Sequence, residues 1–63
     1  MNQPIEKFCL CLRGKKGIFT KGKKYFVSLF YQLPDGDLMV QVQDDDKLTV
    51  QARATRFLLP DNL

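Results

Sequence analysis

Apolar and polar residues alternate most clearly between residues 23 and 43, where two apolar segments flank Pro34-Asp35-Gly36. Proline presets the first corner of a turn. Glycine accepts the left-handed backbone conformation that closes a three-residue hairpin loop. The pattern therefore predicts two antiparallel strands joined by a tight turn, with Leu33 and Asp37 paired at its base.

This register assigns each side chain of the hairpin to one of two faces. It places Gln32 opposite Leu38, Phe30 opposite Val40, and Ser28 opposite Val42. Because strand side chains alternate, one face then holds four apolar residues: Phe30, Leu38, Val40 and Val42. The other face holds Leu29, Tyr31 and Met39.

Two further apolar residues, Tyr25 and Val27, have the opposite parity to Phe30. A strict period of two cannot bury both sets on one face. A bulge near Ser28 resolves the conflict, since bulges bend strands and change the side on which later residues lie. We therefore predict a bulge at Ser28.

The rest of the chain predicts an all-β meander of about five strands in one domain, residues 1–63. We expect a loose terminus over residues 1–4, strands over 5–13, 48–51 and 57–59, turns over 14–17, 20–23 and 44–47, and a helical or 3₁₀ turn over 52–57. Ile18 and Phe19 are expected to fold back onto the core. Closing the sheet into a barrel would remove its unpaired edges.

Composition excludes several classes of protein. No apolar run approaches the roughly 20 residues needed to span a bilayer. The first residues lack a signal-peptide pattern, so we expect a cytoplasmic protein. Cys9 and Cys11 are two apart on a predicted strand, which disfavours a disulfide, and we expect reduced thiols. With no histidine and no third cysteine, neither a metal site nor another cofactor is expected.

The sequence contains no combination of residues typical of a catalytic site. No histidine is present to act as a base near neutral pH, and neither cysteine has a partner that would activate it. The acidic segment 44–46 does not begin a calcium loop, because Thr49 and Thr55 stand where glycine and glutamate are required. We expect a solvated turn there, with pairing of one of its aspartates with Arg56 as an alternative, and we expect no enzymatic activity.

Charge is polarised along the sequence, although the net charge is only +3. Residues 1–33 carry seven basic side chains against Glu6 alone, whereas residues 34–63 carry six aspartates against three basic side chains. The lysine-rich segment 13–25, here called the basic loop, is the alternative candidate site. Its lysines could contact the phosphates of single-stranded nucleic acid, and its aromatic rings could stack on the bases. These candidates are Lys15, Lys16, Phe19, Lys21, Lys23 and Lys24, followed by Tyr25.

The other candidate site is the apolar group Leu29, Tyr31 and Met39. Tyrosine and methionine are enriched where proteins meet, so this group predicts contact with a protein partner or self-association. It would be unavailable if the basic loop or the C-terminal Leu58 and Leu59 covered it. We favour a protein partner and keep nucleic acid as the alternative.

Three short motifs carry a resemblance to a known group of proteins. These are TKGKKYFV at residues 20–27, DDD at 44–46 and ATRF at 54–57. The chain resembles small uncharacterised phage and prophage proteins with an SH3-like β-barrel, although Lys47 and Thr55 stand where that group has glycine and serine. The resemblance implies a five-stranded SH3-like barrel with a 3₁₀ turn before the last strand. It also implies an accessory protein that binds and modulates a partner encoded by a bacterial host.

Overall fold

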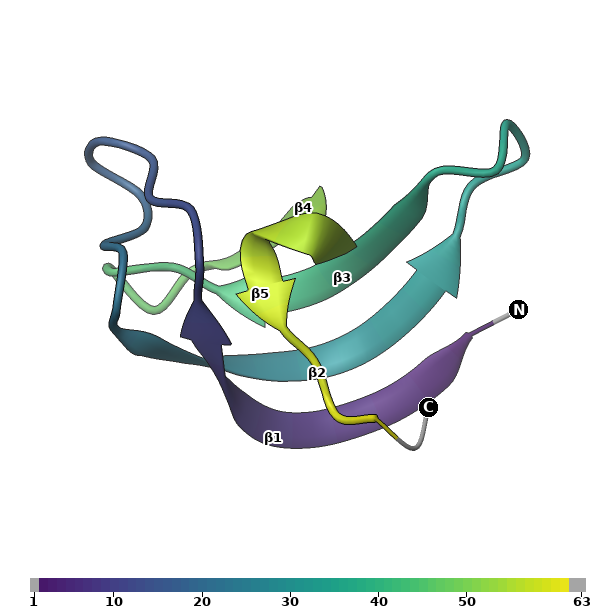
Figure 1. Cartoon of the computed structure of the whole chain (residues 1–63), viewed down its shortest axis with the longest axis horizontal. Coiled ribbons are helices and arrows are strands. Elements are labelled where there is room, and N and C mark those ends of the chain that lie inside the picture. The colour runs from purple at the N-terminus through teal and green to yellow at the C-terminus, as the bar shows by residue number, and fades with distance from the viewer. Residues whose placement is uncertain (1, 62–63) are drawn as a thin grey trace.

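The computed structural model describes residues 2–61, and these form one antiparallel sheet that curls into an open half-barrel (Figure 1). The elements are β1 (Gln3–Cys11), β2 (Lys24–Gln32), β3 (Leu38–Gln43), β4 (Thr49–Arg53), the 3₁₀ helix η1 (Ala54–Arg56) and β5 (Phe57–Leu58). The strand order across the sheet is β4-β3-β2-β1-β5. The predicted all-β class and the 3₁₀ turn before the last strand are confirmed.

The hairpin turn between β2 and β3 forms as predicted. The Leu33 N–H donates to the Asp37 carbonyl at 2.8 Å, and Gly36 has a φ of +98°. The registers of Gln32 with Leu38 and of Phe30 with Val40 are also confirmed. Leu38, predicted to share the apolar face with Phe30 and Val40, is exposed at the end of the hairpin.

The predicted bulge at Ser28 is confirmed. Val27, rather than Ser28, pairs with Val42, so the predicted partner of Ser28 is wrong by one residue. The Ser28 hydroxyl donates to the Gln41 carbonyl at 3.1 Å, which satisfies that carbonyl beside the irregularity. Because of the bulge, Tyr25 and Val27 are buried on the same side of the sheet as Phe30.

The first strand bends at the same level. Pro4 pairs with Leu29 and Lys7 pairs with Val27, so two residues of β1 lie opposite Ser28 alone. One of them, Glu6, has a φ of +52°. Adjacent bulges in neighbouring strands curve the sheet toward its buried face.

The start of β1 corrects the expected N-terminus. Residues 1–4 were predicted to be loose, but Gln3 and Pro4 pair with β2 because the strand continues past its bulge. Met1 lies outside the described residues, as do residues 62 and 63.

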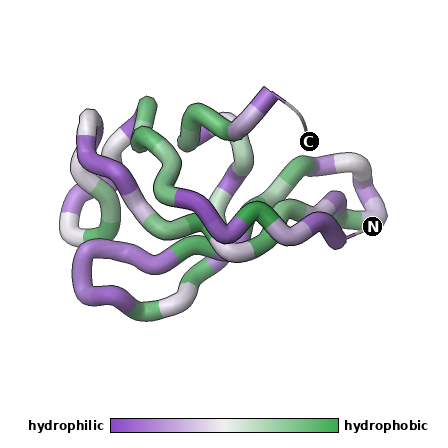
Figure 2. The backbone as a smooth tube through the Cα atoms, turned by 90° about the horizontal axis from the view of Figure 1, so that it is seen from below, coloured by the Kyte–Doolittle hydropathy of each residue, from purple (hydrophilic) through white to green (hydrophobic). Residues whose placement is uncertain are grey.

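η1 and β5 lie over the concave side of the sheet (Figure 1), and both contribute to the core through Ala54 and Phe57. The buried side chains of the core are Ile5, Cys9, Cys11, Phe19, Tyr25, Val27, Val40, Val42, Ala52, Ala54 and Phe57. The rings of Phe19, Tyr25 and Phe57 pack edge to face, with centroids 5.2–6.1 Å apart. Ile18 packs against this core, so the expected return of the loop is confirmed. Figure 2 shows hydrophobic and hydrophilic stretches alternating along the tube.

Candidate functional site

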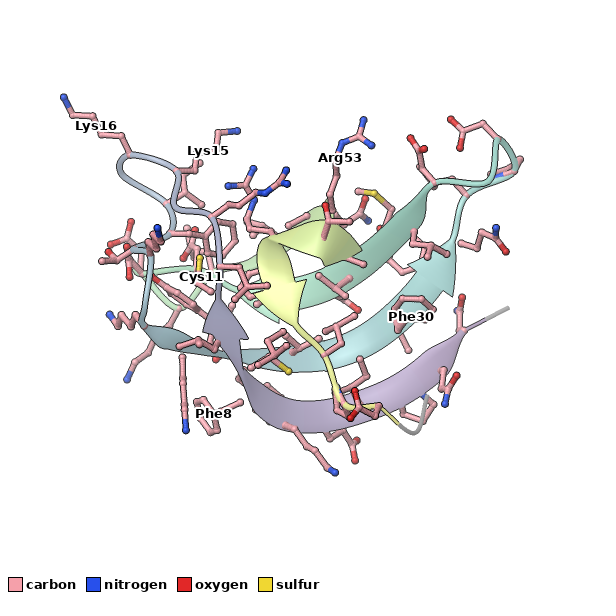
Figure 3. All side chains as sticks on the ribbon, in the orientation of Figure 1. Phe8, Cys11, Lys15, Lys16, Phe30 and Arg53 are labelled. Carbon is pink, nitrogen blue, oxygen red and sulfur yellow. The ribbon has the colours of Figure 1, made fainter. Side chains whose placement is uncertain are left out.

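The largest exposed aromatic side chain of the described residues is Phe8, on the convex side of β1. Phe8 pairs with Phe26 and Leu10 pairs with Leu58, so these four side chains share one face of the sheet. Phe8 is 68% exposed and Leu58 59% exposed, whereas Leu10 and Phe26 are half-buried. We call these four residues the outer apolar face. Figure 3 shows Phe8 projecting away from the side that holds Cys11 and Phe30.

Phe8 stands between two hollows in the surface. One has a volume of about 210 Å³ and separates Phe8 and Phe26 from the turn at Asp44–Lys47. The other has a volume of about 310 Å³ and lies between Phe8 and the segment that begins at Leu58. The ring also packs edge to face on Phe26, with centroids 5.4 Å apart, which restricts its motion. A fixed aromatic ring between two hollows is suited to contact with another protein surface.

Lysines surround the outer apolar face. Lys24 pairs with Leu10 in the sheet, while Lys7 and Lys47 each line one of the two hollows. The ion pairs within residues 2–61 are Lys23 with Asp45 and Arg53 with Asp37. The three lysines form no ion pair within the described part of the chain, and Asp44, Asp45 and Asp61 line the same hollows, so the rim of this face carries charges of both signs.

Sequence reasoning missed this face because β1 has two apolar sets of opposite parity. Phe8 and Leu10 alternate with Cys9 and Cys11, and the cysteines are the buried set. A signal was present, since cysteine is among the residues most often buried. The strand was therefore apolar on both sides, which is unusual for a strand with one solvated face.

The predicted contact group has the same strand parity as the outer apolar face but is less accessible, and Met39 lines a separate groove beside β4. Tyr31 and Met39 pair directly across β2 and β3, and Leu29 lies two residues away. The predicted parity is therefore confirmed, yet all three side chains are half-buried. The Tyr31 hydroxyl oxygen is buried and has no hydrogen-bond partner within residues 2–61.

The aromatic residues of the basic loop cannot stack on nucleic-acid bases in this structure. Phe19 is 5% exposed and Tyr25 4% exposed, so neither ring has a free face for a base, and this part of the nucleic-acid hypothesis is corrected. Lys23 is paired with Asp45 at 3.0 Å. The exposed lysines of the loop that form no ion pair within the described residues are Lys15, Lys16, Lys21 and Lys24.

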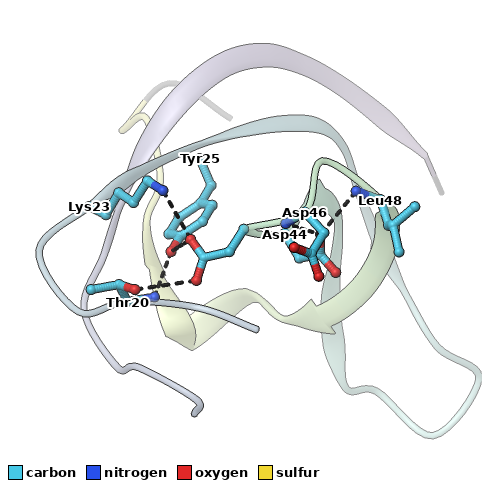
Figure 4. Close-up of polar contacts among 7 residues, drawn as sticks. Thr20, Lys23, Tyr25, Asp44, Asp46 and Leu48 are labelled. Atoms are coloured by element: carbon cyan, nitrogen blue, oxygen red, sulfur yellow. Dashed lines mark hydrogen bonds and ion pairs between the residues drawn. The ribbon is translucent and has the colours of Figure 1, made fainter. Parts of the chain in front are cut away.

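The aspartate turn ties this loop to the barrel (Figure 4). Tyr25 Oη donates to Asp45 Oδ1 at 2.7 Å, and the Thr20 hydroxyl donates to Asp45 Oδ2 at 3.2 Å. Hydrogen bonds from Tyr25 and then Lys23 lower the pKa of Asp45, and its carboxylate raises the pKa of Lys23. The alternative pairing of one of these aspartates with Arg56 does not form within residues 2–61, where Asp45 pairs with Lys23 and Asp44 accepts from the backbone of its own turn.

The two cysteines lie in the core rather than at the surface. Cys9 and Cys11 are buried and unbridged, and burial raises the pKa of the Cys9 thiol, so it is protonated at neutral pH. Residues 2–61 hold no group of three or more cysteine, aspartate or glutamate side chains placed to bind a metal. Within the same residues, no helix has the length and apolar character to cross a membrane.

Comparisons add no relative to this picture. A scan against protein-family models found no match, and searches of the curated proteins and of the solved structures found none either.

Proposed function

We propose that this protein is a non-catalytic accessory module that binds a protein partner through its outer apolar face. The observation that carries the proposal is the exposure of Phe8 beside Leu10, Phe26 and Leu58 on a domain of 7.3 kDa. Small monomers rarely leave such a contiguous apolar surface without a use. The lysines and aspartates of the rim can each pair with a side chain of opposite charge on the partner.

We further propose that the half-barrel is an SH3-like barrel. The long connection between β1 and β2, the strand order and the 3₁₀ turn before β5 support this assignment. A phage or prophage origin, a host-encoded partner and a location in the host cytoplasm rest on the motif resemblance alone.

The test is capture of a partner by matched variants. Immobilised wild-type protein, Phe8→Ala and Leu48→Ala are exposed to a bacterial lysate with and without nuclease, and the bound proteins are quantified. Leu48 is the control because it is 62% exposed but lies outside the outer apolar face. We expect Phe8→Ala to lose a nuclease-resistant partner that Leu48→Ala retains, with an affinity loss of about 30-fold, as for an anchoring aromatic residue.

Stability separates a contact role from a core role. Because Phe8 is exposed, its replacement should leave the thermal midpoint nearly unchanged, whereas a core phenylalanine would cost about 3–5 kcal/mol. Equal capture by wild type and Phe8→Ala, including no capture by either, contradicts the proposal. Loss of the partner on nuclease treatment would favour nucleic acid instead.

A further inference from the structure

A second surface feature is a groove between the basic loop, β4 and η1. It has a volume of about 280 Å³, and its lining includes three cationic side chains, Lys15, Arg53 and Arg56. Figure 3 shows Lys15 and Arg53 on the side of the molecule opposite Phe8, so the groove is separate from the outer apolar face.

Arg56 is held in place without a counterion. Its Nη1 donates to the carbonyls of Arg13 and Gly14 at 3.0 and 3.2 Å, and its guanidinium carbon lies 5.8 Å from the centre of the Phe19 ring. These two bonds do not use Nε or Nη2. No carboxylate of residues 2–61 forms an ion pair with the guanidinium of Arg56. A fixed, uncompensated arginine is suited to a carboxylate, which it binds with little loss of side-chain freedom.

The other cations of the groove strengthen its preference for an anion. Arg53 contacts Asp37 at 3.3 Å, but both side chains are exposed, so water and salt weaken this pair. Lys15 forms no ion pair within the described residues, and no acidic side chain lines the groove.

The remaining lining is apolar except for Gln51 and favours a polypeptide over a nucleic acid. Ile18, Met39 and Val50 line the groove beside the cations. The backbone N–H of Asp45 donates to the Ile18 carbonyl at 3.0 Å, which places the acidic turn next to this lining. A ligand with one or two carboxylates near Arg56 is repelled less by this turn than a polyanion that runs along the groove. The end position of β4 also leaves one side of its backbone without a strand partner, so an extended peptide can pair there.

We propose that this groove binds an acidic segment of a polypeptide, in which a carboxylate contacts Arg56 and Lys15 while a neighbouring apolar side chain contacts Ile18, Met39 and Val50. The site is independent of the outer apolar face and gives the module a second contact of different chemistry. Arg56 supplies orientation, because its plane is fixed, and Lys15 supplies further charge.

The test uses two terminally blocked peptides, acetyl-Leu-Glu-Leu-Glu-amide and its counterpart with glutamine at both glutamate positions. Binding is followed through backbone amide chemical shifts of the full chain. We expect only the acidic peptide to shift amides at Lys15–Phe19, Val50–Arg53 and Arg56. Replacing Arg56 with glutamine should weaken binding about tenfold, the effect of losing a charged hydrogen bond.

Matched variants guard against a fold effect. Lys15 is exposed, so Lys15→Gln should weaken binding by a few fold and leave the amide spectrum of the free protein unchanged. Lys16→Gln is the control, because it removes the same charge from the same loop outside the groove, and it should not change binding. Equal binding of the glutamine peptide, an equal effect of the two lysine variants, or shifts at Phe8 and Leu58 would overturn the proposal. So would tighter binding of a single-stranded oligonucleotide to the same residues.

Discussion

At the scale of single residues, Lys47 is in an unfavourable backbone conformation. It closes the Asp44–Lys47 turn, with its N–H donating to the Asp44 carbonyl at 2.9 Å, and its φ is +62°. An L-residue in this left-handed region carries a cost of roughly 1–2 kcal/mol that glycine avoids. This is also the position where the resembling phage proteins carry glycine.

We therefore predict that Lys47→Gly stabilises the protein. The expected gain is about 0.5–1 kcal/mol in the free energy of unfolding, after the larger unfolded-state entropy of glycine is subtracted. Gly36→Ala should have the opposite sign and a similar size, because a Cβ there would meet only Gln32 Nε2 at 3.9 Å and the cost comes from the φ of +98°. Urea denaturation measures both, and destabilisation by Lys47→Gly would contradict the assigned turn.

Tyr31 allows a second prediction at this scale. Its buried, unpartnered hydroxyl oxygen is exceptional, since most buried polar atoms have a hydrogen-bond partner. Tyr31→Phe should therefore raise the free energy of unfolding by up to about 1 kcal/mol, because it removes a desolvated group without leaving a cavity. Thermal denaturation of the two proteins decides this, and a loss of stability would mean that the hydroxyl is hydrogen-bonded in solution.

At the scale of elements, Asp45 joins two turns that are distant in the sequence. Its side chain accepts hydrogen bonds from Thr20, Lys23 and Tyr25, all of which lie at the end of the basic loop or the start of β2. The loop therefore depends on the aspartate turn for its position. The lowered pKa of Asp45 makes this link sensitive to acid.

The sign of the pH effect follows from that shift. A carboxyl whose folded pKa lies below its unfolded value stabilises the fold above the unfolded pKa, about 3.9 for aspartate, and this contribution is lost as the pH falls through the folded pKa. Asp45→Asn should lower the thermal midpoint at neutral pH, and its difference from wild type should shrink below about pH 4. Asp46→Asn is the control, and a difference that stayed constant with pH would exclude the ionic role of Asp45.

The elements also show what the sequence could predict. The β2–β3 hairpin was predictable because Pro34-Asp35-Gly36 fixes the turn, the turn fixes the register, and the parity conflict of Val27 with Phe30 requires a bulge. The sequence could not predict which face of β1 is buried, because Phe8 and Leu10 on one face and Cys9 and Cys11 on the other are all apolar. Only packing in the core with Phe19 and Phe57 decides which face is buried. For the same reason the sequence indicated Tyr31 as the contact residue, whereas Phe8 is the aromatic residue that the fold exposes.

At the scale of the whole molecule, the polarised sequence charge is partly neutralised by folding. The acidic turn lies against the basic loop, and Lys23 is neutralised by Asp45. The structure thus places apolar and cationic groups together at two surfaces, the outer apolar face and the groove at Arg56. This distribution favours protein partners over an extended polyanion.

The nucleic-acid alternative can be tested quantitatively from the same distribution. The loop lysines that form no ion pair within the described residues, and so can contact phosphates, are Lys15, Lys16, Lys21 and Lys24. With four such contacts, counterion release limits the slope of log affinity against log salt concentration to about −3 for a single strand. Base composition should have no effect, because Phe19 and Tyr25 are buried. Fluorescence anisotropy of labelled oligonucleotides over a range of salt measures both quantities. A steeper slope or a clear base preference would mean that another surface binds nucleic acid, whereas no binding at about 50 mM salt, where non-specific binding is strongest, would remove the alternative.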